Sequence, residues 1–250
     1  NRLKKAKEGV YKLDKTRNVL WMENTKAFPE NVIFESLLTF VGEPTGKNIN
    51  PVTPDETAIS VIQHYSFVAL PDDKYSPRVF ETRCGSFPME YMDYATPIWE
   101  PIKKRFIYRH RLEKKNPDLA ISEAVEPIIY YLDSGTPEPI RSALLEGASW
   151  WNQAFEAIGY NNGFQVKMLP EDADPLDLRY NLIQWVHRST RGWSYGSTIS
   201  DPRTGEIIKG HVSLGSLRIR QDFLIAQALM NQPFAERDDN YEPMLSMALA

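Results

Sequence analysis

The stretch Pro127-Ile-Ile-Tyr-Tyr-Leu132, followed by Asp133-Ser-Gly-Thr136 and a long periodic segment, decides the fold of the second half of this chain. The opening run is short and almost entirely apolar, which is typical of a strand buried on both faces. From Pro137 to Ile158 the apolar residues recur with a helical period and form one stripe. Thr136 is placed to cap this helix and Gly159 to end it. A buried strand followed by an amphipathic helix predicts a mixed α/β unit.

Further strands, a hairpin and a helix continue this unit. Strands are predicted at Phe164–Leu169 and Asn181–His187, and the two arms of a hairpin at Tyr195–Ser200 and Glu206–Leu214. The turn sequence Asp201-Pro-Arg-Thr-Gly205 joins the two arms and predicts a positive φ at its glycine. We expect Leu217–Met230 to be helical and Pro243–Ala250 to begin another helix.

The first half of the chain carries a β pattern instead. Val32–Val41, Ala58–Leu70 and Ile102–Leu112 are rich in Val, Ile, Phe and Tyr, with partial alternation and with Gly- and Pro-rich breakers between them. A polar stretch at residues 113–125 separates the two halves. We therefore expect an α+β chain: an antiparallel β-rich domain at residues 1–115, and a mixed-sheet-plus-helix unit at residues 125–250.

Composition excludes several classes of protein. The net charge of −4 favours no polyanionic partner, so we expect no nucleic-acid binding. The basic run from Lys103 to Lys115 is better explained as a charged edge strand. No run approaches the ~18 apolar residues of a membrane span. The single cysteine, Cys84, excludes an internal disulfide and any Cys-cluster metal site.

Neither a complete active site nor a metal motif can be read from residue spacing. The four histidines are His64, His110, His187 and His211; no pair has metal-ligand spacing on a helix, and H-E-x-x-H does not occur. His187 and His211 could meet across paired strands, or be ordinary strand-end histidines. The acidic loop Glu171–Asp177 could bind calcium, although it lacks the EF-hand spacing.

Several segments, taken in order, are similar to one known family. They are Pro127–Tyr131, Glu138–Phe155, Tyr180–His187, Trp193–Gly196 and Asp201–Ile207. Together they resemble the start of a metzincin-type zinc metalloprotease domain. With Asn31–Phe40 and Ser66–Asp73, the resemblance extends to large bacterial zinc-dependent metalloproteases whose catalytic domain follows a β-rich domain of unknown function. The resemblance implies a metalloendopeptidase in which zinc-activated water hydrolyses a peptide bond.

The resemblance also implies what this chain lacks. The family places its zinc motif, H-E-x-x-H-x-x-G-x-x-H, on the next helix. The given sequence stops at Ala250, and we expect this motif to follow in the parent protein. No catalytic or metal-binding residue is therefore assigned here. Zinc is expected as the cofactor of the full-length protein only, and this fragment is expected to be inactive.

One binding element is implied within the chain. Metzincins bind a peptide or protein substrate antiparallel to an exposed edge strand. By order of elements this strand corresponds to Tyr195, Gly196, Ser197, Thr198, Ile199 and Ser200. The alternative is an ordinary hairpin strand.

The competing function is a non-catalytic β-rich binding or assembly module of the bacterial cell envelope. A zinc motif downstream in the parent protein would favour the protease, and a parent without histidines beyond Ala250 would favour the module. The family resemblance implies an exported, periplasmic or envelope-attached protein, although the first residues contain no apolar signal segment.

Overall fold

The computed structural model describes residues 2–188 and 193–229. It is β-rich, with antiparallel sheets and few helices, as the sequence predicts. The chain divides into two compact units, residues 1–69 and 70–250, and each is described by itself. Residues 70–115 thus group with the second unit, while the domain boundary at residues 113–125 stays a prediction.

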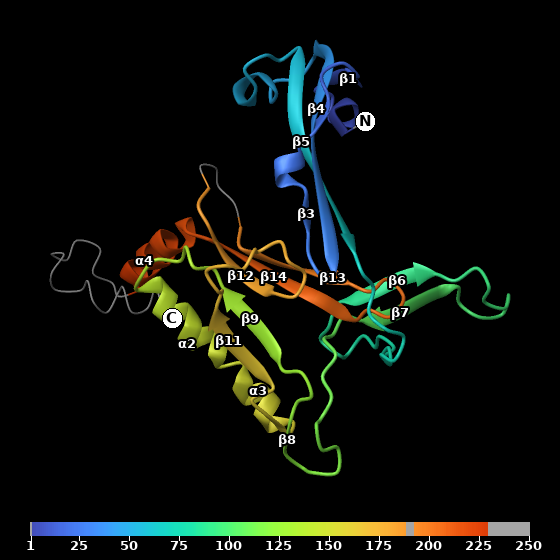
Figure 1. The fold of residues 1–250 in the computed structure, drawn as a ribbon, viewed down its shortest axis with the longest axis vertical. Coiled ribbons are helices and arrows are strands. Elements are labelled where there is room, and N and C mark those ends of the chain that lie inside the picture. Colours follow the sequence, from blue (N-terminus) through green and yellow to red (C-terminus); the bar gives the residue numbers. More distant parts are fainter. Residues whose placement is uncertain (1, 189–192, 230–250) are drawn as a thin grey trace. The chain divides into compact units, whose positions relative to one another are not determined.

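The first unit is a five-stranded antiparallel sheet built around one long strand (Figure 1). The long strand β4 (Asn31–Pro44) pairs along one edge with the whole of β5 (Ala58–Val68). Along its other edge it pairs with three shorter strands, β1, β2 and β3. The elements are α1 (Arg2–Lys5), β1 (Gly9–Leu13), β2 (Val19–Leu20), η1 (Met22–Asn24), β3 (Lys26–Ala27), β4 (Asn31–Pro44), η2 (Asn50–Val52) and β5 (Ala58–Val68). The predicted strands at Val32–Val41 and Ala58–Leu70 are confirmed as β4 and β5.

The two faces of the β4–β5 pair differ. On one face Ile33 is only 1% exposed, and Glu35 accepts a hydrogen bond from Asn24 Nδ2 at 2.8 Å. On the other, large apolar side chains remain in solvent: Phe34, Tyr65 and Phe67 are 37%, 48% and 64% exposed. Alternation along β5 therefore produces an apolar face that the described residues of this unit leave largely uncovered.

The second unit is organised by a five-stranded sheet whose order is β11-β9-β12-β14-β13 (Figure 1). The strands are β9 (Ile128–Leu132), β11 (Phe164–Met168), β12 (Asn181–Val186), β13 (Tyr195–Ser200) and β14 (Ile207–Gly215). The first four in this order run parallel, and β13 runs antiparallel to β14 at the edge. The predicted strands and hairpin are confirmed, and Gly205 has the expected positive φ of 78°.

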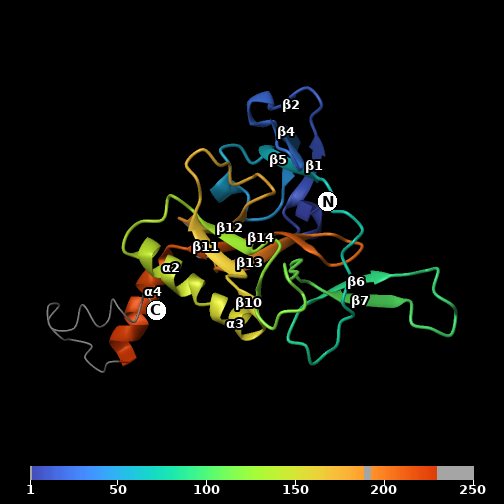
Figure 2. The same ribbon diagram turned by 60° about the horizontal axis from the view of Figure 1, so that its bottom comes forward.

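The predicted helix from Pro137 to Ile158 is wrong in its continuity. It forms as α2 (Ile140–Ser149) and α3 (Asn152–Ala157), which lie alongside β9 and β11 (Figures 1 and 2). Between the two helices the turns are tighter than in an α-helix. The Trp150 N–H donates to the carbonyl of Gly147, three residues earlier, at 3.3 Å, whereas an α-helical bond would reach the residue four positions earlier. Helix α4 (Leu217–Leu229) follows β14 and confirms its prediction within the described residues.

The predicted helix cap is also corrected. No side-chain cap precedes α2, and the Thr136 side chain is fully buried instead. The carboxylate of Glu138 accepts hydrogen bonds from the Ser142 N–H at 3.3 Å and its hydroxyl at 2.8 Å, and so serves the first turn. Gly159 ends the helical segment with a φ of 89°, as predicted.

Two small ribbons complete the second unit. β6 (Pro88–Met92) pairs with β7 (Lys103–Ile107), and β8 (Ser122–Glu123) pairs with β10 (Tyr160–Asn161). Two basic residues of β7 share one acidic partner, since Lys103 and Arg105 both contact the Glu90 carboxylate, at 2.6 and 2.8 Å. Among the described residues, no helix has the length and apolar content needed to cross a bilayer.

Candidate functional site

Strand β13 presents a free edge of the second sheet. Among the described strands it pairs with β14 alone. Five of its six residues, Tyr195 to Ile199, are exposed, and Ser200 is half-buried. The N–H and C=O groups along an unpaired edge are a template for another strand. The structure therefore places the six predicted binding residues together, at a sheet edge.

The side chains of β13 are smaller on one face of the sheet than on the other. Gly196 lies opposite Val212, and Thr198 opposite Gly210, so these small residues share the sheet face that packs against α2 and α3. Tyr195 and the other odd-numbered residues of the strand point to the opposite face.

Arg188 supports the start of β13. Its guanidinium donates to the Trp193 carbonyl at 3.1 Å and to Ser213 Oγ at 3.0 Å. It also lies over the Tyr195 ring, at 5.6 Å from the centroid. The sequence offers no signal for this role, because the partners are 5 to 25 residues away and the spacing has no motif.

The far end of β13 is fixed by buried carboxylates in the hairpin turn. Asp201 is fully buried, and Arg203 Nη2 donates both to its carboxylate at 2.6 Å and to the Pro71 carbonyl at 2.9 Å. The Arg203 hydrogen bonds hold the pKa of Asp201 below its usual value. Glu206, also buried, receives two hydrogen bonds from Arg111, at 2.8 and 3.0 Å. The turn is thus a rigid anchor rather than a loose loop.

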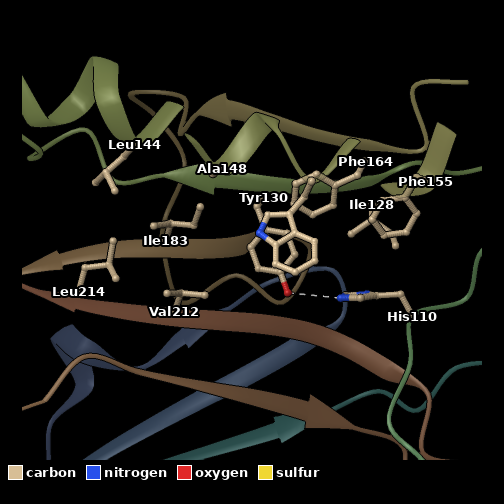
Figure 3. Close-up of a pocket in the computed structure, with 11 residues that line it drawn as sticks. His110, Ile128, Tyr130, Leu144, Ala148, Phe155, Phe164, Ile183, Val212 and Leu214 are labelled. Carbon is tan, nitrogen blue, oxygen red and sulfur yellow. Dashed lines mark hydrogen bonds between the residues drawn. The ribbon is translucent and has the colours of Figure 1, made fainter. Parts of the chain in front are cut away.

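An apolar groove of about 400 Å³ lies between the helices and the helix-side face of the sheet (Figure 3). Its walls are almost wholly hydrocarbon. They are formed by Leu144, Ala148, Trp151 and Phe155 from the helical segment, by Ile128, Tyr130, Phe164, Ile183, Val212 and Leu214 from the sheet, and by His110. The Phe155 and Phe164 rings stack at 5.5 Å and close one end.

His110 and Tyr130 form a hydrogen-bonded pair in the wall of this groove. His110 Nε2 and Tyr130 Oη are 3.4 Å apart and face each other in Figure 3. Burial lowers the pKa of His110 to about 4 and raises that of Tyr130, so both side chains are neutral at pH 7. Gly210 makes room for the phenol, since a Cβ there would overlap the Tyr130 hydroxyl. The pair is a neutral hydrogen bond in an apolar wall.

The proposed meeting of His187 and His211 does not occur. His211 lies opposite Leu182 and bonds to Gln184 at 3.2 Å, whereas His187 bonds to Ser216 Oγ at 2.9 Å, beyond the last paired residue of β12. Within residues 2–188 and 193–229, no group of three or more His, Cys, Asp or Glu side chains is placed to hold a metal ion.

The acidic loop at 171–177 is held by the side chain of Lys209. The buried ammonium of Lys209 donates to the carbonyls of Pro175 and Asp177, at 2.6 and 2.8 Å. The Asp177 carboxylate is paired with Arg179 at 2.6 Å. Calcium binding by this loop stays a hypothesis, and the ammonium already occupies two of the loop's oxygens.

Comparison with known proteins gives a match to the first part of the chain. No curated protein and no solved structure matches the chain significantly. Residues 1–115 match a family model described as a domain of unknown function, DUF5117. This match covers the first 115 residues, and its description is consistent with a domain of unknown function in this part of the chain.

Proposed function

We propose that the second half of the chain is the peptide-binding part of a zinc-dependent metalloendopeptidase, and that β13 takes up the substrate as an added strand. The free, exposed edge of β13 carries this proposal. The strand directly precedes the hairpin turn at Asp201–Gly205, and the family resemblance implies that a substrate would pair with this strand. Export to the periplasm or attachment to the envelope remains part of the same proposal.

The binding step uses the main chain of this protein. An extended peptide would exchange N–H···O=C bonds with β13, which needs no particular substrate sequence. Its side chains would alternate between the two faces of the sheet. Arg188 and Asp201 hold the two ends of β13, so the edge is ordered before the peptide arrives and less conformational entropy is lost on binding.

We derive no catalytic step through zinc. The described residues hold no group suited to a metal, and the ligands that the resemblance implies belong to a motif that is not in this chain. The chain's own contribution is to bind and orient the peptide. We expect the purified 250-residue chain to bind no stoichiometric zinc and to hydrolyse no casein; metal analysis and a casein assay measure both.

Hydrogen exchange tests the binding edge. Reduced, unfolded casein peptides are expected to protect amides of β13 and to leave those of β11, the opposite edge, unchanged. Successive amides of a strand point to opposite edges, so Ser197→Pro and Thr198→Pro are compared. One of them should keep the β13–β14 pairing and lose peptide binding at least tenfold. Equal binding by both variants, or no protection in β13, would refute the edge-strand proposal.

The protease assignment has its own test. The parent coding sequence should contain His-Glu-x-x-His within roughly twenty residues after Ala250, and a third His six residues later. A parent without this motif removes the protease assignment, while a peptide-binding edge would still stand.

A non-catalytic binding module is the second candidate, and one observation favours it. The β4–β5 face in the first unit exposes Phe34, Tyr65 and Phe67, and large exposed apolar patches mark interaction surfaces. If the zinc motif is absent, this face makes a binding or assembly role for the chain the better explanation.

A further inference from the structure

Strand β5 forms one edge of the sheet in the first unit (Figure 1). Among the described strands it pairs with β4 alone, over all eleven of its residues, Ala58–Val68. The register is continuous, without a bulge, and the sequence of β5 contains no Lys, Arg, Asp, Glu or Pro. Bulges, charged side chains and prolines are what ordinarily protect an edge strand from pairing with another chain, so β5 is a long and unprotected edge.

The main-chain groups of β5 that point away from β4 follow from the ladder between the two strands. The Ala69 N–H donates to the Glu30 carbonyl at 2.8 Å, and the Gly42 N–H donates to the Thr57 carbonyl at 3.0 Å. Hydrogen-bonded positions alternate along an antiparallel ladder, so the odd-numbered residues of β5 direct their N–H and C=O groups at β4. The even-numbered residues of the strand therefore direct theirs outward.

The sequence of β5 is nearly palindromic in residue type about its central residue, Gln63. If two copies of β5 pair antiparallel about Gln63, each residue meets the one that lies equally far on the other side of Gln63. The pairs are Ala58–Val68, Ile59–Phe67, Ser60–Ser66, Val61–Tyr65 and Ile62–His64. Apolar and aromatic residues thus meet each other, serine meets serine, and one pair is mixed. Even-numbered residues also meet even-numbered ones, as the outward N–H and C=O groups require.

The side chains of two paired β5 strands would be compatible as well. Val61, Tyr65 and Phe67 are exposed on one face of the sheet. Aromatic side chains beside β-branched ones are favourable cross-strand neighbours, and pairing would bring them together. No like charges would meet, because β5 contains no acidic residue, no Lys and no Arg, and its one histidine would lie opposite Ile62.

We propose that two copies of this chain associate through β5, paired antiparallel about Gln63, so that their two sheets become one continuous sheet. The occupant of the edge is a second copy and not an unrelated peptide, since a foreign strand would match this order of residue types only by chance. A two-fold axis at Gln63 satisfies both strands equally. This inference does not depend on the proposed function, because it concerns the other unit and a different edge from β13.

Disulfide formation at the two-fold axis tests the register. Gln63 would face its own copy as a non-hydrogen-bonded pair, with Cα atoms about 4.5 Å apart, which a disulfide can bridge. The exposed Cys84 is first replaced by serine, and Gln63→Cys is compared with Ser66→Cys. Ser66 is also exposed on β5, but its two copies would lie about 20 Å apart. Mild oxidation should link Gln63→Cys chains into dimers at least tenfold faster, and equal rates would overturn the proposal.

Charges introduced at Gln63 provide a second test, read by sedimentation. The unmodified chain should dimerise, and Gln63→Lys should weaken the dimer at least tenfold, since two ammonium groups would then face each other. Mixing Gln63→Lys with Gln63→Glu should restore the dimer, which also shows that both variants are folded. Ser36→Lys, at the β4 residue paired with Gln63, is the matched control and should leave the dimer intact.

Two results of the sedimentation experiment would overturn the proposal. One is a chain still monomeric at about 100 µM, where a complex with a micromolar Kd is already formed. The other is a dimer that Gln63→Lys leaves unchanged, because its interface would then lie elsewhere, for example at β13.

Discussion

The neutral state of His110 predicts a specific acid sensitivity of the second unit. Burial lowers the pKa of this imidazole from 6.5 to about 4, and no carboxylate contributes to the change. In the unfolded chain the imidazole takes up a proton near pH 6.5, well before it does so in the folded protein. Folding stability therefore falls from about pH 6.5 and levels off below about pH 4. At ~1.4 kcal/mol per pH unit, the loss is at most roughly 3 kcal/mol.

The test compares wild-type protein with His110→Gln, which cannot titrate but can still bond to Tyr130. His187→Gln, at an exposed histidine, is the matched control. Urea unfolding is followed by tryptophan fluorescence at several pH values between 7 and 4, since five of the six tryptophans lie in the second unit. We expect the wild type and His187→Gln to lose stability on acidification and His110→Gln to lose about 3 kcal/mol less. Parallel curves for wild type and His110→Gln would refute the burial argument.

Further substitutions test the packing around the sheet. Gly210→Ala should destabilise by about 1–3 kcal/mol, because its Cβ collides with the Tyr130 hydroxyl; Gly147→Ala, in α2 with open space around it, should stabilise by ~1 kcal/mol. Thermal unfolding measures both, and equal signs would contradict the geometry. Asp201→Asn should cost about 1–3 kcal/mol at pH 7 through the Arg203 hydrogen bonds. Urea titrations should show this difference shrinking progressively as the pH falls below 3.8, the ordinary pKa of an aspartate, because the lowered pKa of Asp201 stabilises the fold fully only above that value.

The sequence pattern predicts correctly those elements that depend on neighbouring residues alone, such as short apolar strands and tight turns. β9 and β12 are short apolar runs, and the β13–β14 hairpin is set by a turn with its glycine at positive φ. The position of β13 at the edge followed from a family resemblance and not from the residues. Its neighbours in the sheet depend on pairings between segments far apart in the sequence, which no local period encodes.

The failures have equally physical causes. The apolar stripe continues through Gly147, Ala148 and Trp151, so periodicity predicts one helix, but it cannot reveal that the turn tightens there. Thr136 fits a capping pattern, yet Glu138 serves the first turn. No spacing or motif in the sequence marks Lys209, because only the fold brings the Pro175 carbonyl to its ammonium.

The bare edge of β13 has a consequence for handling the protein in solution. Edge strands are ordinarily protected by lysine, proline or a covering loop. The edge strand Tyr195-Gly-Ser-Thr-Ile-Ser200 contains neither charge nor proline. Main-chain pairing cannot distinguish a foreign peptide from the same strand of another molecule. Crowded molecules of this chain should therefore compete with peptides for one another's β13, and a lysine at Ser197 should reduce their aggregation by repulsion between like charges.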